Sequence, residues 1–450
     1  MEKSVDSRSF YKKVFILVLP MALQNLINVG VTSSDVIMLG RVGEKVLSGA
    51  SLGGQIYFIM TLIFFGLTSG ASVLTAQYWG KQEKDTIEKI LGMALRFSVI
   101  ISLVFTAVTF CFPSYLMRIF SSDAQVIEQG TAYLRIVCFS YLPASITMVY
   151  LNVMRSIERV TISTIVYFVS FIANIVFNGI FIFGLFGAPV MGVRGAALGT
   201  VLARLIELGI VIYYNAKRNK DVQFRIKYWL GTEKWLLKDF ISFSMPVVIN
   251  ELMWGLGTAA NTAILGHLGS AVTAANSVTQ VIRQLAMVIC FGLANATAIL
   301  IGKSIGEGNM EQARDYGRRF RNLSVILGAG GACVVLLVRP IAMSFMTVSD
   351  QSLEYMSMML FVMSYYVIAQ AYNTTMIVGV FRAGGDTKFG LVLDVSTMWF
   401  GSIILGFVAA FILKLPVTAV YMIVMCDEII KVPLCMHRYG SYKWLKDVTR

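Results

Sequence analysis

The chain has 450 residues, of which 57% are hydrophobic and 14% are charged, and its mean hydropathy is +0.72. Soluble domains carry about 25% charged residues, so this composition excludes a soluble protein and predicts an all-α integral membrane protein. The net charge of +13 does not indicate nucleic-acid binding, because the cations lie in short segments between apolar runs, with no basic motif and interleaved aromatic residues.

Twelve apolar runs are long enough to cross a bilayer, which takes about 20 mostly apolar residues. They cover residues 14–39, 47–76, 90–111, 131–154, 161–185, 191–213, 240–265, 273–301, 320–346, 354–381, 388–413 and 416–436. The first run has no small-residue cleavage site, so we expect a retained span rather than a signal peptide. The longest polar stretch divides six runs from six. It predicts an N-lobe (1–214), a cytoplasmic linker (215–238) and a C-lobe (239–450).

The two halves repeat each other in sequence. The segment that begins at Pro20 matches the segment that begins at Pro246, and the offset of 226 holds without a gap for about sixty residues. Gly43 pairs with Gly269 and Gly80 with Gly306. Each copy holds an even number of spans, so both copies enter the membrane from the same side. The sequence therefore predicts two pseudo-symmetric six-helix lobes related by a parallel repeat, as in many secondary transporters.

Lys and Arg are distributed unequally between the two sides of this arrangement. When cations toward the ends of the runs, Lys431 among them, are counted with the adjoining segments, the termini and the loops after even-numbered runs hold 29 of the 38, whereas the loops after odd-numbered runs hold 6. This asymmetry predicts that both termini are cytoplasmic.

Proline lies inside the first span of each half, at Pro20 and Pro246. A proline in a membrane helix frees a backbone carbonyl and permits a bend. The bend is either a static kink or a hinge. The occurrence of the proline in both halves of the chain favours a hinge.

Polar side chains of the first half fall in one layer near the outer ends of their helices. They are Asp35 on the first span, Asn174 and Asn178 on the fifth, and Thr200 on the sixth. Asn174 and Asn178 are four residues apart and share a helix face. One carboxylate with neutral oxygens suits a monovalent hard cation such as Na⁺, or a proton. The alternative is polar contact between helices without ion binding.

In the second half, Glu251, Arg283 and Asp427 fall at comparable depths on three different spans. Ionisable residues at such depth are expensive and mark candidate substrate or proton sites. Glu251 is either fixed in a salt bridge with Arg283 or free to titrate and bind substrate. The pairs Arg204/Glu207 and Glu428/Lys431 have i, i+3 spacing and are interpreted as structural, whereas Asp394 is ambiguous.

Several chemistries find no support in the sequence. The six cysteines have no metal or redox spacing, and the two histidines belong to no Cys/His ligand set. No phosphate-binding loop of the G-x-x-x-x-G-K-[ST] type is present. We therefore expect no enzyme activity, and no cofactor other than a coupling ion.

These features resemble the multidrug and toxic compound extrusion (MATE) family over nearly the whole chain. The resemblance depends on the order and spacing of several stretches. They are the segment from Pro20 to Gly43, Asn174–Gly184, Gly192–Thr200 and Arg382–Thr387. It implies two six-helix lobes around a central cavity, in a monomer of the bacterial inner membrane. It also implies efflux of organic cations, including amphipathic ones, in exchange for Na⁺ or H⁺.

Carried over by position, Asp35, Asn174, Asn178 and Thr200 match the family's first-lobe cation site, and Glu251 matches an acid on the seventh helix. Some branches have Asp where this chain has Asn178, and some carry an acid on the tenth helix that has no counterpart here.

Three other functions remain as alternatives. A lipid-linked oligosaccharide flippase of the same wider superfamily would favour basic residues along the cavity. An integral-membrane enzyme would need a cluster of catalytic residues at one membrane face. A channel would not need the duplicated lobes and paired prolines that favour alternating access.

Overall fold

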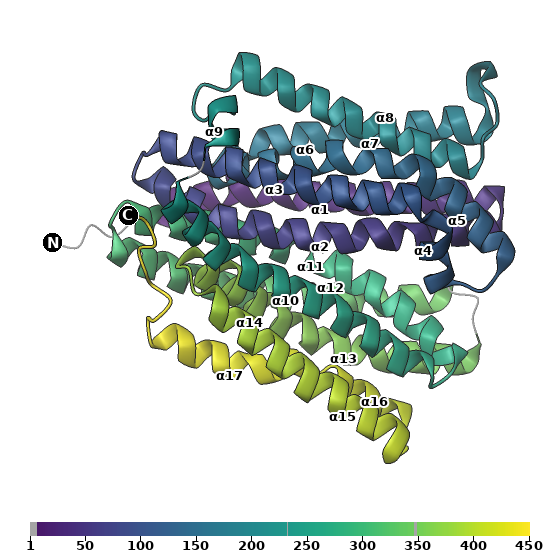
Figure 1. Ribbon diagram of the computed structural model, residues 1–450. Helices are drawn as coiled ribbons and strands as arrows, with labels where there is room; N and C mark the ends of the chain where they lie inside the picture. Colours follow the sequence, from purple (N-terminus) through teal and green to yellow (C-terminus); the bar gives the residue numbers. More distant parts are fainter. Residues whose placement is uncertain (1–6, 232, 346–348) are drawn as a thin grey trace. The chain divides into compact units, whose positions relative to one another are not determined.

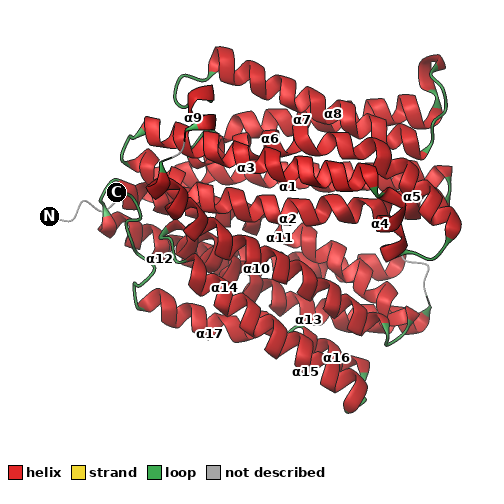
Figure 2. Cartoon of the chain, in the orientation of Figure 1, coloured by secondary structure: helices red, strands yellow, loops and turns green. Residues whose placement is uncertain are grey.

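In this computed structural model the described residues are 7–231, 233–345 and 349–450, and every regular element among them is a helix (Figure 2). Eleven helical segments of this described part are long and apolar enough to cross a membrane. The all-α fold class predicted from composition is therefore confirmed.

The first half of the chain forms nine α-helices. They are α1 (Ser7–Val42), α2 (Glu44–Gly80), α3 (Lys84–Cys111), α4 (Pro113–Phe120), α5 (Ala124–Val137), α6 (Tyr141–Ser156), α7 (Val160–Phe183), α8 (Val193–Tyr213) and α9 (Ile226–Leu230). The run predicted at 131–154 is one span made of α5, the 3₁₀ turn Cys138–Ser140 and α6. Figure 1 shows α3, α6, α7 and α8 running alongside one another.

The second half forms eight α-helices interrupted by π-helical stretches. The helices are α10 (Lys234–Gly266), α11 (Ser270–Gly306), α12 (Met310–Phe345), α13 (Asp350–Thr374), α14 (Thr387–Ser396), α15 (Leu405–Phe407), α16 (Val417–Val424) and α17 (Asp427–Gly440). The π-helical stretches are Thr375–Phe381, Thr397–Ile404 and Val408–Ile412. α1 continues through Pro20 and α10 through Pro246.

The helices group into two compact units. The N-terminal unit contains residues 23–75 and 82–241, and the C-terminal unit contains 7–22, 76–81 and 242–450. The boundaries of these units differ from those of the predicted lobes at two places within the first half. The start of α1 and the end of α2 belong with the second half, because their side chains pack there. Phe10, for example, is buried against the rings of Tyr316 and Phe320.

The repeat is visible in the turns between helices. Gly43 and Gly269 precede the second helix of each half with positive φ, and each carbonyl accepts a bond from the residue four positions later, Leu47 in the first copy and Thr273 in the second. After these helices, Gln82 and Gly308 both adopt left-handed φ angles of 61° and 74°. Each turn recurs at the offset of 226, so the sequence repeat is also a structural repeat.

The predicted twelfth run, 416–436, is not one continuous helix. α16 ends at Val424 and α17 begins at Asp427, so the helix is interrupted at Met425 and Cys426. The predicted run is therefore built from two consecutive helices, and its charged residues Asp427, Glu428 and Lys431 all lie in the second of them.

The predicted linker, 215–238, is folded onto the N-terminal unit. It contains α9, which packs on α3, and the start of α10. Tyr228 of α9 donates a hydrogen bond to Asp85, and Arg225 pairs with Glu88 at 2.8 Å. The segment is therefore tied to the first turns of α3.

Candidate functional site

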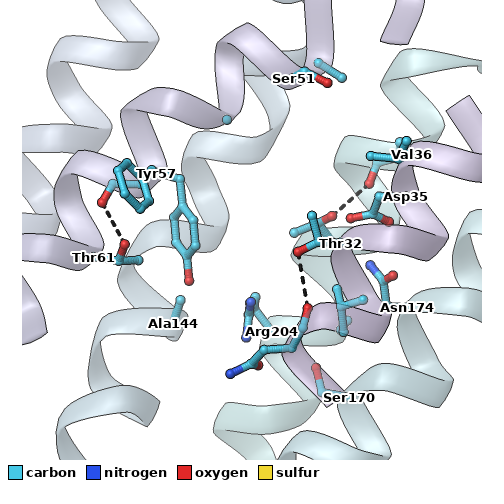
Figure 3. A pocket seen from close by; sticks show the side chains of 18 of the residues that line it. Thr32, Asp35, Val36, Ser51, Tyr57, Thr61, Ala144, Ser170, Asn174 and Arg204 are labelled. Carbon is cyan, nitrogen blue, oxygen red and sulfur yellow. Dashed lines mark hydrogen bonds between the residues drawn. The ribbon is translucent and has the colours of Figure 1, made fainter. Parts of the chain in front are cut away.

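A cavity of about 650 Å³ opens inside the N-terminal unit and contains most of the predicted first-half site. Its lining comes from α1, α2, α5, α6, α7 and α8. Figure 3 shows Asp35, Thr32 and Asn174 on one side of this pocket and Tyr57 with Thr61 on the other.

Asp35 and the two asparagines of α7 form one hydrogen-bonded group. The Asn178 side-chain nitrogen donates to Asp35 Oδ1 at 2.6 Å and to Asn174 Oδ1 at 3.2 Å. Asn178 is fully buried and does not line the cavity, so it supports Asp35 from behind, whereas Asp35 and Asn174 face the open space. The spacing of four residues predicted that both asparagines share a helix face, and the contact between them confirms this prediction.

A glycine on the neighbouring helix makes room for this group. A side chain at Gly199 of α8 would place its Cβ 2.4 Å from the Asn178 Oδ1 atom. That oxygen is buried and has no hydrogen-bond partner among the described residues. The close approach of α7 and α8 therefore leaves an unused acceptor beside the carboxylate.

Thr200, the fourth predicted residue, lines the same cavity one residue beyond Gly199. Its hydroxyl donates to the Ala196 carbonyl at 3.0 Å, so its lone pairs remain available to a ligand. The structure thus brings Asp35, Asn174, Asn178 and Thr200 to one place. Their role in ion binding stays a prediction.

The charge pair Arg204–Glu207 also lines this cavity, at 2.6 Å, and sequence reasoning had assigned it a structural role only. Glu207 is buried and neutralises Arg204. Asp35, in contrast, has no ion-pair partner in the part of the chain that the structure describes. The cavity therefore holds one carboxylate that lacks a counter-ion.

Aromatic and thioether side chains cover much of the remaining wall, and sequence reasoning did not identify them individually. They are Tyr57, Phe58, Tyr133, Met148 and Tyr167. No spacing signal sets them apart from other aromatic residues of the spans. Only the folding of α2, α5, α6 and α7 around one space brings them together.

In the C-terminal unit, Glu251 pairs with Arg382 rather than with Arg283. The Arg382 guanidinium lies 2.9 Å from Glu251 Oε1, and both side chains are largely buried. Arg283 instead donates to Gln280 and Gln370, at 2.8 and 3.1 Å. Of the two alternatives left open for Glu251, the bridge with Arg283 does not form, because position along a helix gives depth but not the direction in which a side chain points.

Asp427, the third predicted residue of this half, pairs with Lys431 at 3.3 Å. Among the described contacts, Glu251, Arg283 and Asp427 do not touch one another. Asp394, left ambiguous by the sequence, bonds both to Lys431 and to Asn250. The second half therefore holds two separate buried charge groups.

The described residues contain no group of three or more His, Cys, Asp or Glu side chains placed to hold a metal ion. A site built on Asp35 has one carboxylate and neutral oxygens, which matches the charge of a monovalent ion. This arrangement of long apolar helices, a duplicated fold and a cavity lined by a carboxylate outside any described ion pair is that of a multi-pass membrane transporter.

Comparison with known proteins defines the transporter class. The sequence model of the MatE family matches residues 20–180 and 246–412, two segments that begin at the two repeat prolines. The chain therefore belongs to the MatE family.

Relatives and solved structures agree with this family over nearly the full chain. A probable multidrug resistance protein NorM of Thermotoga maritima is 23% identical, covering 97% of this chain and 93% of the relative. The probable multidrug resistance protein YoeA of Bacillus subtilis is 22% identical, covering 98% and 96%. A MATE transporter of Vibrio cholerae shares the fold with a TM-score of 0.88 at 16% identity, covering 97% and 99%.

Proposed function

We propose that this chain is a secondary active efflux antiporter that exports organic cations in exchange for Na⁺ or H⁺ by alternating access. It would act in the bacterial plasma membrane with both termini in the cytoplasm, as the asymmetry of Lys and Arg supports. Two relatives are themselves described as probable multidrug resistance proteins.

One observation carries the proposal: Asp35 lines a cavity of about 650 Å³ and has no counter-ion among the described residues. An uncompensated carboxylate in a poorly solvated site favours a bound proton or monovalent cation. Asn174, Thr200 and Asp35 itself would contact that ion. Asn178, whose nitrogen faces Asp35 here, would hold the carboxylate in place and would offer an oxygen only after rotation of its amide.

The cavity wall supports an organic cation as the transported substrate. Tyr57, Phe58, Tyr133 and Tyr167 provide aromatic faces for cation–π contact, and Met148 provides adaptable apolar surface. Drug and coupling ion would then affect each other's affinity through the same negative charge and the conformations that it favours.

The lining argues against a flippase for pyrophosphate-linked lipids. Arg204 is the one cation among the cavity-lining residues, and its charge is already neutralised by Glu207. An anionic headgroup would find no unpaired cation along this wall.

Transport in proteoliposomes tests the proposal. Ethidium efflux should be driven by an imposed inward Na⁺ gradient or an imposed inward proton gradient, and an ionophore that dissipates the active gradient should stop it. If neither gradient drives the movement of ethidium or of other cationic dyes that the purified protein binds, the antiport proposal is wrong.

A further inference from the structure

A second buried charge group lies in the C-terminal unit, apart from the Glu251–Arg382 pair. Lys431 Nζ lies 3.0 Å from Asp394, 3.0 Å from Glu428 and 3.3 Å from Asp427. The side chains of Lys431, Asp427 and Glu428 are 4%, 5% and 10% exposed, and that of Asp394 is 20% exposed. We call these four residues the Lys431 cluster.

The Lys431 cluster has more acids than bases. Three carboxylates surround one ammonium group. Two other cations of this unit make no described ion pair with the cluster, because Arg382 is paired with Glu251 and Arg283 donates to two glutamines. Even when both arginines and Glu251 are counted, four acids face three bases. A buried, uncompensated carboxylate is costly, so the group needs at least one further positive charge.

The missing charge is better supplied by a proton than by a metal ion. The Lys431 ammonium already occupies the position between the three carboxylates where a metal ion would sit. The three carboxylates are also not close enough together to be a metal-binding group among the described residues. A proton needs no coordination shell, and carboxylates crowded in one site readily retain one.

Two buried amides supply acceptors that match a protonated carboxyl group. Asn250 donates to Asp394 Oδ2 at 2.9 Å, and Asn373 donates to Glu428 Oε2 at 2.8 Å. The Oδ1 atom of each amide is buried without a hydrogen-bond partner in the described structure, and both side chains are at least nine-tenths buried. An unused buried acceptor is unfavourable, and a carboxyl O–H is a donor that would satisfy it.

The interrupted helix provides a further sign of a site. The break between α16 and α17 puts Asp427 and Glu428 in the first turn of α17, where the helix dipole favours negative charge. Discontinuous helices at membrane depth mark ion-binding positions in secondary transporters.

We propose that Asp394, Asp427, Glu428 and Lys431 form a second proton-binding site, with Asp394 as the carboxylate that exchanges the proton. Asp394 is the most exposed member, and from α14 it bonds to two other helices, through Asn250 on α10 and Lys431 on α17. The proton adds to a carboxylate oxygen of Asp394, and on release that oxygen again accepts from Lys431. The inference rests on the proposed function as a cation-coupled transporter.

Protonation at this position would act on the arrangement of helices. A neutral Asp394 no longer attracts Lys431, which then pairs with Asp427 and Glu428 on its own helix, so α14 and α17 lose their ionic link. Other titratable or charged groups also face the Lys431 cluster. They are Tyr366 on α13, Cys426 and Cys435 beside and on α17, Glu251 on α10, and Arg283 on α11.

Infrared difference spectra recorded between high and low pH on the reconstituted protein test the site, because protonated buried carboxyl groups absorb apart from exposed ones. The Asp35→Asn variant should retain a buried carboxyl band, and Asp394→Asn should lose it. The double variant Asp35→Asn/Asp394→Asn should lose the carboxyl band of Asp35 and that of Asp394. Glu354→Gln, at an exposed carboxylate of α13, should change neither. A spectrum of Asp394→Asn identical to that of the wild type would overturn the inference.

A second variant and a change of salt cover the cases in which Asp394→Asn does not fold or the site binds a metal ion. If Asp394→Asn does not fold, Asp394→Glu must shift the band, and an unshifted band excludes Asp394. The spectra are repeated with NaCl in place of choline chloride, and a band that Na⁺ removes would assign the site to a metal ion instead of a proton. Absence of gradient-driven transport in the wild type would contradict the proposed function while leaving the titration of the Lys431 cluster measurable.

Discussion

Gly80 and Gly306 occupy equivalent positions in the two repeats and pack against each other where α2 and α11 end. A Cβ at Gly80 would lie 2.2 Å from the Lys303 carbonyl oxygen and 2.9 Å from the backbone of Gly306. A Cβ at Gly306 would lie 1.9 Å from the Gln77 carbonyl oxygen. Two related helix ends therefore meet backbone to backbone, and neither tolerates a side chain at the contact.

Substitution at this contact should destabilise the protein. Gly306→Ala forces α11 away from the backbone of α2, and overpacking of this kind costs about 1–3 kcal/mol. Thermal unfolding of the purified protein in detergent measures the effect. Gly209→Ala in α8 is the matched control, because nothing lies within 4 Å of its Cβ position, and it should be neutral or slightly stabilising. Equal melting temperatures for Gly306→Ala and the control would contradict the tight contact.

Asp35→Asn should uncouple transport from the ion gradient. The variant keeps the size and hydrogen bonding of the side chain but removes the one carboxylate of the cavity that lacks a counter-ion. We expect dye efflux in proteoliposomes to fall to the level of empty vesicles while dye binding in detergent persists. Na⁺ or protons should weaken dye binding to the wild type, and this dependence should disappear in Asp35→Asn.

Asn178→Ala should have a milder effect than Asp35→Asn, because it removes a neutral support of the carboxylate and no charge. If Asp35→Asn exports dye at the wild-type rate under an imposed gradient, the hydrogen-bonded group of Asp35, Asn174 and Asn178 has only a structural role.

The Glu251–Arg382 pair should couple stability and transport. Glu251→Ala leaves a largely buried guanidinium without its carboxylate, and breaking such a pair costs about 3–5 kcal/mol. Removing both partners in Glu251→Ala/Arg382→Ala should restore part of the melting temperature, and the double-mutant cycle gives the interaction energy. An additive cycle would show that the two side chains do not interact.

Glu251→Gln separates the two roles, because its amide oxygen still accepts from Arg382 while its charge is lost. We expect the variant to fold and to export cationic dyes more slowly than the wild type. Unchanged efflux at equal expression would assign Glu251 a structural role only.

Thiol labelling checks the orientation. In a variant without native cysteines, Lys220→Cys lies at an exposed position of the segment before α10 and should resist a membrane-impermeant reagent applied outside whole cells. Val190→Cys, in the loop between α7 and α8, is 74% exposed and should react. The reverse pattern would invert the topology.

Asp221 should make the folded segment before α10 sensitive to acid. Partial burial raises the pKa of Asp221, but the Arg159 guanidinium at 2.6 Å and Lys84 at 3.4 Å outweigh burial and hold that pKa below its usual value. A carboxyl group with a depressed pKa stabilises the fold above its unfolded-state value of about 3.9, and this contribution is lost as the pH falls through the folded-state value.

The melting temperatures of the wild type and Asp221→Asn should therefore differ near neutral pH and converge in acid. The difference should be small, since surface pairs contribute roughly 0.2–1 kcal/mol. Glu354→Gln, which removes an exposed carboxylate with no ion pair among the described residues, controls for the change in net charge.

The sequence predicted those features that depend on periodicity along the chain. The 226-residue repeat recurs in the turns at Gly43 and Gly269, and the four-residue spacing of Asn174 and Asn178 recurs as a direct contact. Features that depend on rotation of one helix against another were not predictable. The depths of Glu251 and Arg283 along their helices made a bridge between them one alternative. In the folded protein the Glu251 side chain faces Arg382 instead.

Lys431 shows a second limit of the sequence. Its i, i+3 spacing from Glu428 predicts a local structural pair near the cytoplasmic end of the last run. In the structure it is 4% exposed and bonded to acids of α14 and α17. Lys431 is neutralised in part by Asp394, which lies far from it in the sequence. No local sequence pattern indicates such a distant partner.

The location of Phe10 among residues of the second half has a consequence for biosynthesis. The start of α1 leaves the ribosome first, but the rings that cover Phe10 belong to Tyr316 and Phe320 of α12, which are made much later. During most of translation the rings of α12 that cover Phe10 have not yet been made. The earliest segment of the chain is thus among the last to reach its native contacts, so a ribosome that stops after the first repeat releases an N-terminal half with an unfilled packing surface.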